Sequence, residues 1–357
     1  MLNTARVLID LGALRHNLAV VRSLCPASRV MAMVKADAYG HGLLPAARAL
    51  ADADGLAVAR LDEALRLRAA GIGQRVLLLG TLLDEDDLKR CSAHSIDITI
   101  HDTATAKRVL AVAPTAPLRV WLKLDGGMHR LGLNPAEFSA WDQRLRGAAG
   151  VAELTHLMHF ASAEDFISPA AARQLERFDG CHGDEAAASL ANSAALIARP
   201  ATRRDWVRPG IMLYGDNPLA DSHPLPLRPV MSLRARVLAV RDLAAGESVG
   251  YNATWTAARP SRIAASGIGY GDGYPRHAPN GTPVWINAQR APLAGRVSMD
   301  SITVDVTEGG PLAVGDEVEL WGAQLPAADV ARHAGTISYA LFTGVTTRVT
   351  REYVEAL

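Results

Sequence analysis

The chain has 357 residues, with 37 basic (Lys and Arg) and 37 acidic (Asp and Glu) side chains, so its formal net charge is zero. This balance argues against a surface built to bind nucleic acid or an anionic membrane. Its content of 49% hydrophobic and 21% charged residues is typical of a globular protein. At roughly 150 residues per domain, the length predicts two domains.

The N-terminal segment and the metal-binding residue types narrow the class further. Arg6 and Asp10 stand where a signal peptide needs an apolar core, and no apolar run approaches the ~18 residues of a membrane span. We therefore expect a cytoplasmic protein with no membrane contact. The cysteines form no Cys-x-x-Cys pair and the histidines no His-Glu-x-x-His motif, so we expect reduced thiols and no metal site.

Short apolar runs rich in β-forming residues alternate with segments of helical periodicity over the first part of the chain. The runs are Val30–Val34, Leu56–Ala59, Val76–Leu79, Ile96–Ile100, Arg119–Leu124, Leu154–His159, Ala187–Leu190 and Val207–Leu213. Alternation of this kind predicts a parallel sheet, and this number of runs favours a (β/α)8 barrel of the TIM type over an open sheet. We assign residues 1–225 to this barrel domain.

The composition changes after the last run. Residues 216–230, DNPLADSHPLPLRPV, carry several prolines and are typical of a linker. Beyond them, MSLRARVLAV alternates apolar with polar or small residues, and glycine-punctuated β-like runs continue to the end. We therefore assign residues 226–357 to a mostly-β domain with one helix near Pro326–Ala334.

Lys35 ends the first apolar run, in VMAMVKADAYGHG (residues 30–42). A lysine there can simply extend its charged end to solvent. At the C-terminal rim of a barrel its amine can instead condense with an aldehyde to form a Schiff base. A free lysine with a pKa near 10.4 is neutral only about once in 2,500 molecules at pH 7, so its surroundings must favour the neutral form. This points to an aldehyde cofactor or a carbonyl substrate.

Two further loops at the same rim suggest a phosphate site. Pro209 and Gly210 in VRPGIMLYG form a turn that can expose backbone N–H groups, and Asn192-Ser193 adds a hydroxyl donor. Each signal is weak alone, because an Asn-Ser pair is usually a helix cap. Loops after strands seven and eight often bind phosphate in barrels. Lysine and phosphate together suggest pyridoxal phosphate, although an aldolase acting on a sugar phosphate also fits.

Two residues suggest substrate chemistry. GIGYGDGYPRH (residues 267–277) fails the dinucleotide fingerprint and is either a tight β turn or a loop that presents Tyr270. A tyrosinate base at pH 7 needs a pKa about three units below 10, or roughly 4 kcal/mol. Arg130, in DGGMHR after the fifth run, is either a surface charge or a clamp for a substrate carboxylate.

Eight motifs then occur together and in order from about residue 6 to residue 353: VKADAYGHG, LKLDGGMHRLG, MHFASAED, LANSAA, VRPGIMLYG, GYGDGYPR, GRVSMD and TRVTREY. This set resembles the alanine racemase family, whose members are pyridoxal-phosphate enzymes with a barrel and a β-domain. The resemblance implies interconversion of L- and D-alanine by two bases. It also implies a homodimer in which each β-domain contributes to the partner subunit's active site.

The resemblance implies roles for single residues. Lys35 corresponds to the Schiff-base lysine and the base for the D-enantiomer, and Tyr270, from the partner subunit, corresponds to the base for the L-enantiomer. Arg208 corresponds to the arginine that faces the pyridine nitrogen, and His159 to the histidine that links this arginine to the tyrosine. A permanent guanidinium cation cannot give its proton to that nitrogen, so the ring is a weaker electron sink than in enzymes with an aspartate there.

The remaining carried-over roles concern binding. The cofactor-binding set also includes Tyr39, Asn192, Ser193, Gly210, Ile211 and Tyr353, most of them at the phosphate. The substrate carboxylate corresponds to Arg130 and the backbone of Met299, the latter again from the partner subunit. Lys123 corresponds to a lysine that is often carbamylated, and Asp300 to a motif residue near the same place. Ser189 and Leu157 depart from the family pattern at positions where some members carry His and Tyr.

Four alternatives are weighed against this interpretation. An amino-acid decarboxylase of the same architecture needs an acidic partner for the pyridine nitrogen and a cysteine in the β-domain, whereas this chain has Arg208 and no cysteine after Cys181. A non-catalytic pyridoxal-phosphate carrier lacks the second domain, and a barrel aldolase needs neither that domain nor Tyr270. A racemase of broader substrate range differs less, although such proteins are commonly exported.

Overall fold

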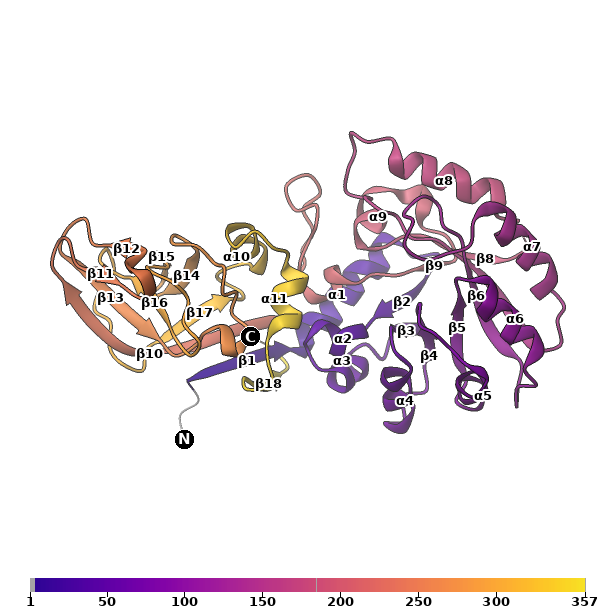
Figure 1. Ribbon diagram of the computed structural model, residues 1–357, viewed down its shortest axis with the longest axis horizontal. Coiled ribbons are helices and arrows are strands. Elements are labelled where there is room, and N and C mark those ends of the chain that lie inside the picture. The colour runs from indigo at the N-terminus through magenta and orange to yellow at the C-terminus, as the bar shows by residue number, and fades with distance from the viewer. Residues whose placement is uncertain (1–3, 184, 357) are drawn as a thin grey trace.

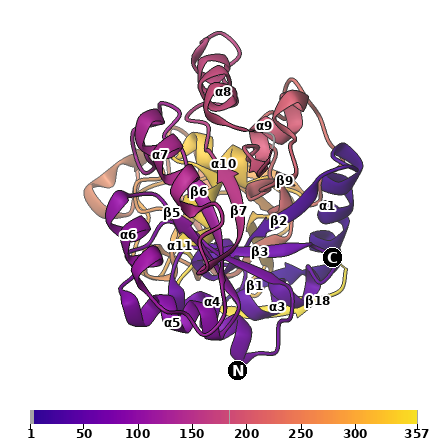
Figure 2. The ribbon, with the colours of Figure 1, turned by 90° about the vertical axis from the view of Figure 1, so that its right-hand side faces the viewer.

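The structure is a computed structural model that describes residues 4–183 and 185–356 of the chain. It has two parts arranged along the long axis of the molecule, a barrel wrapped in helices and a sheet-rich part (Figure 1). Viewed from the barrel end, the helices surround the strands as an outer layer (Figure 2).

The barrel closes from eight parallel strands, each paired with the next and the last with the first. The strands are β2 (Arg29–Met33), β3 (Gly55–Val58), β4 (Arg75–Leu78), β5 (Ile96–Ile100), β6 (Leu118–Lys123), β7 (Val151–Leu157), β8 (Ala187–Ser189) and β9 (Trp206–Val207). Parallel strands covered by helices are buried on both faces, which explains why they appear in the sequence as continuous apolar runs. The predicted (β/α)8 barrel is confirmed.

Helices connect and cover these strands. They are α1 (Leu11–Leu24), α2 (Lys35–Tyr39), α3 (Leu43–Ala49), α4 (Leu61–Ala69), α5 (Glu85–Ala93), α6 (Thr103–Ala111), α7 (Pro135–Leu145), α8 (Ala170–Cys181) and α9 (Ser193–Ala198). Side chains at the N-cap positions Asp84, Asp102 and Asn134 accept backbone N–H groups that the first helical turn leaves unpaired. The sequence interpretation did not single out α1, α7 or α9.

The eighth predicted run, Val207–Leu213, is only partly a strand. β9 ends at Val207, and Ile211–Tyr214 form a 3₁₀ helix (η2). Pro209 has no N–H to donate, and Gly210 has backbone angles outside the helical and extended regions (φ −119°, ψ −94°). The chain therefore turns at the rim instead of extending the strand, as the Pro-Gly pair suggested.

The second part is built on an eight-stranded sheet. Its strands are β1 (Ala5–Asp10), β10 (Met231–Leu243), β13 (Ser261–Ser266), β14 (Pro283–Ile286), β15 (Gln289–Pro292), β16 (Ile302–Asp305), β17 (Glu317–Trp321) and β18 (Thr350–Val354), and the short strands β11 (Ser248–Val249) and β12 (Trp255–Thr256) form a separate pair. The predicted mostly-β part is confirmed. It carries two helices where one was predicted, α10 (Ala327–His333) and α11 (Ser338–Gly344).

The sheet takes one strand from the beginning of the chain. β1 pairs antiparallel with β10 and parallel with β18. By its pairing, this strand belongs to the second part, although the sequence interpretation placed residues 1–225 in the barrel domain. The division of the chain near residue 225 stays a prediction.

The two parts meet close to Lys35. Helix α2 packs against α11, and the Arg351 side chain donates to the carbonyl oxygens of Gly40 (2.9 Å) and Val345 (3.0 Å). A Cβ on Gly40 would lie 2.2 Å from the Phe342 carbonyl oxygen, so only glycine permits this approach. The second part therefore supports the loop that follows the first barrel strand.

Candidate active site

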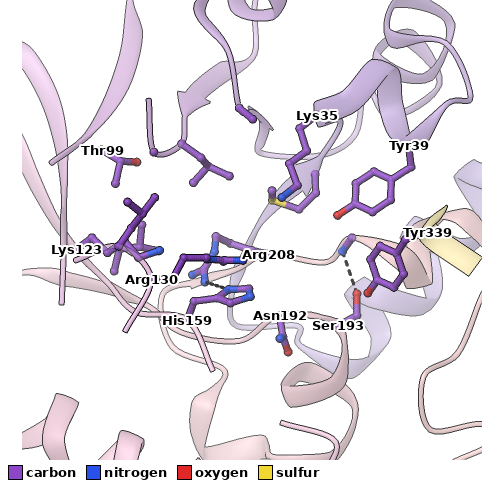
Figure 3. A pocket seen from close by; sticks show the side chains of 17 residues that line it. Lys35, Tyr39, Thr99, Lys123, Arg130, His159, Asn192, Ser193, Arg208 and Tyr339 are labelled. Atoms are coloured by element: carbon purple, nitrogen blue, oxygen red, sulfur yellow. Dashed lines mark hydrogen bonds between the residues drawn. The ribbon is translucent and has the colours of Figure 1, made fainter. Parts of the chain in front are cut away.

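A cavity of about 310 Å³ opens at the C-terminal ends of the barrel strands. The residues that line it are Met33, Lys35, Tyr39, Ala59, Leu79, Gly80, Thr99, Lys123, Arg130, Leu131, Leu157, His159, Asn192, Ser193, Arg208, Gly210 and Tyr339. Figure 3 shows Tyr39, Ser193 and Tyr339 on one side of Lys35 and the cations Lys123, Arg130 and Arg208 on the other, where Thr99 also lies. This is the edge where barrel enzymes place their chemistry.

Lys35 follows β2 and begins α2, so it lies at the predicted rim position. Its side chain points into the cavity (Figure 3). Burial lowers the pKa of its amine, and the neighbouring cations Arg130 and Arg208 lower it further, while the Glu63 carboxylate acts in the opposite direction. The cavity therefore favours the neutral, nucleophilic form of the amine more than water does.

The chain takes an unusual path directly after Lys35. The four residues Ala36–Tyr39 have φ between 53° and 55°, the left-handed region that residues other than glycine rarely adopt. A left-handed helical residue costs about 1–2 kcal/mol, so this turn costs several kcal/mol. Strain of this kind concentrates at functional sites and persists only where the surroundings fix it.

The turn places the Tyr39 side chain in the cavity wall. Its hydroxyl lies so close to Gly210 that a Cβ there would be 2.6 Å from the oxygen. Burial raises the pKa of Tyr39, so its hydroxyl is a neutral donor or acceptor. Its ring stacks on Tyr214 (centroids 4.8 Å apart) and also contacts Tyr339 (5.6 Å). Gly210 and Tyr39 thus form one closely fitted corner.

Ser193 completes that corner. Its Oγ accepts the N–H of Gly210 (2.9 Å) and that of Met212 (3.5 Å), which binds the loop after β9 to the start of α9. Asn192 is the N-cap of α9 and accepts the N–H of Ala195 (3.0 Å), as the cap interpretation predicted, and it also lines the cavity. Ile211 follows Gly210 at the start of η2, but its side chain does not line the cavity.

Arg208 is the most buried cation of the site, at 4% exposure. It donates to Ser189 Oγ (2.6 Å), to the Met158 carbonyl oxygen (2.7 Å) and to His159 Nδ1 (3.4 Å). Burial lowers the pKa of Arg208 to about 9, so it keeps its charge at neutral pH. Burial and the surrounding cations lower the pKa of His159 to about 2, so His159 is neutral and accepts at Nδ1.

Lys123 adds a further positive charge beside Arg208. Burial, together with the charges of Arg208, Arg130 and Lys35, lowers the pKa of its amine to about 8. Asp125 is the one carboxylate that acts on it in the opposite direction, and that carboxylate already accepts the N–H groups of Gly127 and His129. A cavity with this excess of cations is suited to anionic groups.

Tyr270, Met299 and Asp300, like Ile211, do not line this cavity. Tyr270 and Met299 are 38% and 52% exposed on the second part, and neither lines the cavity of its own chain. The two loops that carry them are joined by backbone hydrogen bonds from Tyr270 N to the Ser298 oxygen (3.0 Å) and from Gly271 N to the Met299 oxygen (2.9 Å). Asp300, also exposed, accepts from Arg348 Nη2 (2.7 Å).

Tyr353 was predicted at the phosphate, but the structure places Tyr339 in the cavity wall instead. The Tyr353 hydroxyl lies against Gly42 on the other side of the turn, where a Cβ would clash with it. Sequence reasoning missed Tyr339 because it opens α11, a helix that was not predicted. The signal in the sequence was Ser338-Tyr339, a polar pair that follows Ile337 at the start of a short apolar helix.

No group of three or more His, Cys, Asp or Glu side chains that could hold a metal ion occurs within residues 4–183 and 185–356. Over the same residues, no helix combines the length and the hydropathy needed to span a bilayer.

Comparison with known protein families identifies the family of this chain. Residues 9–218 match the alanine racemase N-terminal domain and residues 230–353 match the alanine racemase C-terminal domain. The chain belongs to the alanine racemase family. It is 48% identical over 349 residues to the biosynthetic alanine racemase of Pseudomonas aeruginosa, covering 97% of this chain and 98% of that protein. It is 49% identical over 353 residues to the alanine racemase of Chromohalobacter salexigens, covering 98% and 97%.

Solved structures of alanine racemases share the fold. The biosynthetic enzyme of Pseudomonas aeruginosa superposes with a TM-score of 0.95 at 47% identity, covering 99% of this chain and 100% of that one. The enzyme of Acinetobacter baumannii gives 0.92 at 37% identity, with the same coverage. The resemblance seen in the motifs therefore extends over both parts of the chain.

Two departures from the family pattern now have a structural setting. Ser189 is fully buried and holds Arg208 through its hydroxyl, so a hydroxyl stands where some alanine racemases carry an imidazole. Leu157 lines the cavity as a buried aliphatic side chain in place of a tyrosine. Neither departure removes a group that could react.

Proposed function

We propose that this chain interconverts L- and D-alanine with pyridoxal phosphate bound in the barrel cavity. The observation that carries the proposal is the Lys35 amine, which faces one cavity with the Tyr39–Ser193 corner on one side and Arg208 on the other (Figure 3). The relatives and solved structures of highest similarity given above are all named alanine racemases.

The residues present fit this cofactor. Lys35 would hold its aldehyde carbon, and the corner formed by Tyr39, Ser193 and Gly210 has the hydroxyl donors and the glycine that a phosphate requires for close approach. Arg208 would face the ring nitrogen. When bound, the cofactor supplies a carbonyl for the substrate amine and a conjugated ring that delocalises the electron pair left at Cα.

Two side chains would move the Cα proton. The neutral Lys35 amine, favoured by its lowered pKa, takes the proton on the D side, and the Tyr270 side chain takes it on the L side as a tyrosinate. After one base has removed the proton, the protonated form of the other delivers a proton to the opposite face of Cα, so the configuration inverts. Arg208 keeps its own proton at neutral pH, so it would not protonate the ring nitrogen, and the ring would be a moderate electron sink.

The cations around Lys123 would bind the substrate carboxylate and a second anion. Arg130 supplies a guanidinium that can pair with the carboxylate in two parallel hydrogen bonds, and the backbone of Met299 adds a donor. With a pKa of about 8, Lys123 is neutral in about one molecule in ten at pH 7. That neutral amine can add carbon dioxide and lose a proton, which places a carbamate anion between Arg130 and Arg208.

The active site would be shared between two copies of the chain. Tyr270 and Met299 are exposed and their loops are held together, yet neither lines the cavity of its own chain. We assign them, with Asp300, to the cavity of a partner subunit in a homodimer. Residues 226–357 would then act in trans on the barrel of residues 1–225. Cytoplasmic location stays a prediction.

Mixed dimers test the proposal. Homodimers of Lys35→Ala and of Tyr270→Phe each lack one base at both sites and are expected to be inactive. If the bases come from different chains, a Lys35→Ala/Tyr270→Phe heterodimer contains one site with both bases, and up to half of the wild-type activity returns. Refolded or co-expressed heterodimers, separated by two affinity tags, are assayed by chiral chromatography.

An inactive heterodimer would contradict the shared site. Wild-type protein that binds pyridoxal phosphate but racemises neither alanine enantiomer would contradict the proposed function itself. The same chiral assay with a panel of L- and D-amino acids distinguishes an alanine racemase from one of broader range.

A further inference from the structure

Glu63 lies beneath the left-handed turn that follows Lys35. It is in the first turn of α4 and is only 8% exposed. One carboxylate oxygen accepts the N–H groups of Ala36 (2.7 Å) and Asp37 (3.4 Å), and the other accepts those of Ala59 (3.0 Å) and Arg60 (3.1 Å). A single side chain therefore joins the start of the turn to the end of strand β3.

This arrangement requires the ionised form of Glu63. All four partners are backbone donors, and only a carboxylate presents acceptors alone on both oxygens. An amide or a protonated acid would direct an N–H or O–H at one of these donor pairs.

The other end of the turn is held by a different side chain. His41 Nδ1 contacts the carbonyl oxygens of Ala38 (3.0 Å) and Tyr39 (2.9 Å), and since both are acceptors, Nδ1 carries the proton. Asp37 Oδ1 accepts the N–H of Leu43 (2.9 Å), which fixes the exit into α3. The turn is thus anchored at both ends, and Glu63 is the anchor next to Lys35.

The negative charge of Glu63 also acts on the Lys35 amine. The other charges that act on the amine, Arg130 and Arg208, are cations, and Glu63 is the carboxylate among them. Removing its charge therefore changes both the path of the backbone at Lys35 and the charge balance around the amine. These two effects act on one of the two proposed bases and leave Tyr270 untouched.

We propose that Glu63 is a positioning residue for Lys35, whose ionised carboxylate fixes the left-handed turn so that the Lys35 amine and the Tyr39 hydroxyl face the same cavity. The inference rests on the proposed function, in which Lys35 moves the proton on the D side. It assigns a role in proton transfer to a side chain outside the cavity wall.

The test uses the full-length holoenzyme and the isosteric variant Glu63→Gln. We expect kcat/KM to fall roughly 10- to 100-fold, since small misplacements of a reacting group have effects of this size. The fall must be equal in both directions, because enantiomers have equal free energies in water. Cα-deuterated substrates separate the two bases: the primary isotope effect should rise with D-alanine, whose proton Lys35 removes, and decrease with L-alanine.

Three comparisons make this signature specific. Asp62→Asn removes the same charge one residue away at an exposed position, and it should change neither rate nor isotope effects. Glu63→Asp keeps the carboxylate but shortens its reach, so it should recover part of the rate lost in Glu63→Gln. Protein in which the variant merely reduces the number of folded sites would lose rate with both isotope effects unchanged.

Isotope effects of wild-type size in both directions for Glu63→Gln overturn the proposal. If Glu63→Gln does not give soluble protein, the same measurement on Glu63→Asp decides, and unchanged isotope effects there overturn it as well. Failure of the proposed function can be distinguished from failure of the Glu63 proposal. In the former case the wild-type protein itself would racemise neither enantiomer.

Discussion

The two candidate bases stand in very different surroundings. Lys35 is enclosed by its own chain: the turn after it is held at both ends, and its amine lies among cations that lower its pKa. Tyr270 is 38% exposed, on a loop held to the Met299 loop by two backbone hydrogen bonds, with the Arg276 guanidinium 5.8 Å from its ring. The residues that surround Lys35 all come from its own subunit, whereas Tyr270 stays exposed when the subunit is taken alone.

This difference suggests that the two parts of the chain contribute to different functions of the site. The barrel, together with Tyr339 from the second part of the same chain, supplies a cavity suited to the proposed cofactor, and the loops that carry Tyr270 and Met299 would serve the barrel of a partner subunit. Cofactor binding should then depend on residues around Lys35, and turnover should depend on both regions. The following variants separate these two dependences.

The largest effect is expected for Lys35→Ala. It removes the proposed base and the proposed covalent attachment point, so racemisation should fall by at least about 10³-fold and the yellow colour expected of the bound cofactor should be lost after gel filtration. Tyr270→Phe should lose comparable activity but stay yellow, because it leaves the cavity intact. Absorbance and chiral assays check both variants. A Tyr270→Phe protein that lost its colour would contradict the division between the two regions.

An intermediate effect is expected for Gly269→Ala. The added Cβ would lie 2.3 Å from the carbonyl oxygens of Ser298 and Met299, so the two loops must separate. A displacement of about 1 Å at a reacting group can cost roughly 100-fold in rate, and cofactor binding should be unchanged. Gly73→Ala, where nothing lies within 4 Å of the added atom, is the matched control. Full activity in Gly269→Ala would show that the joint between the loops is dispensable.

The smallest effect concerns stability near Lys35. Burial lowers the pKa of His41 to about 4, so the unfolded chain binds more protons than the folded chain below the ordinary histidine pKa near 6.5. Stability therefore falls as the pH decreases, and between pH 7 and pH 5 this group removes about 2 kcal/mol. Urea unfolding of His41→Gln, which keeps an N–H donor, should lack this loss.

His333→Gln, at an exposed position in α10, serves as the control for that experiment. If His41→Gln and wild type lost equal stability between the two pH values, the buried neutral state of His41 would be wrong. Because the comparison is a difference between variants, the titration of other groups cancels.

The sequence predicted most of the barrel because its strands are buried on both faces and are separated by amphipathic segments. The same apolar pattern misled at Val207–Leu213, where backbone geometry at Pro209 and Gly210 overrides apolar character. β1 was missed because its partners, β10 and β18, lie hundreds of residues further along the chain, and no local pattern encodes such a pairing.

The candidate site was predicted to a similar extent and for similar reasons. Lys35 and Ser193 follow predicted apolar runs, Arg208 lies in the last one, and the three lie together because parallel strands end at one rim. Tyr339 and Glu63 were missed because each comes from a helix whose relation to that rim depends on tertiary packing. The left-handed conformation of Ala36–Tyr39 could not be predicted either, since its residue types do not favour it and its stabilising contacts come from elsewhere.

The pairing of β1 with β18 has a consequence for the order of events during synthesis. Residues 29–207, which carry every strand of the barrel, leave the ribosome before Tyr270 has been translated. The second sheet cannot be completed until Val354 has been translated. Its strand order places β1 between β10 and β18, and β18 ends at Val354. Until then the edge of β1 that pairs with β18 has no partner strand. A nascent chain can therefore form the barrel strands around Lys35 early, but Tyr339, which completes the cavity wall, and the sheet that supports the Tyr270 loop come only near the end of translation.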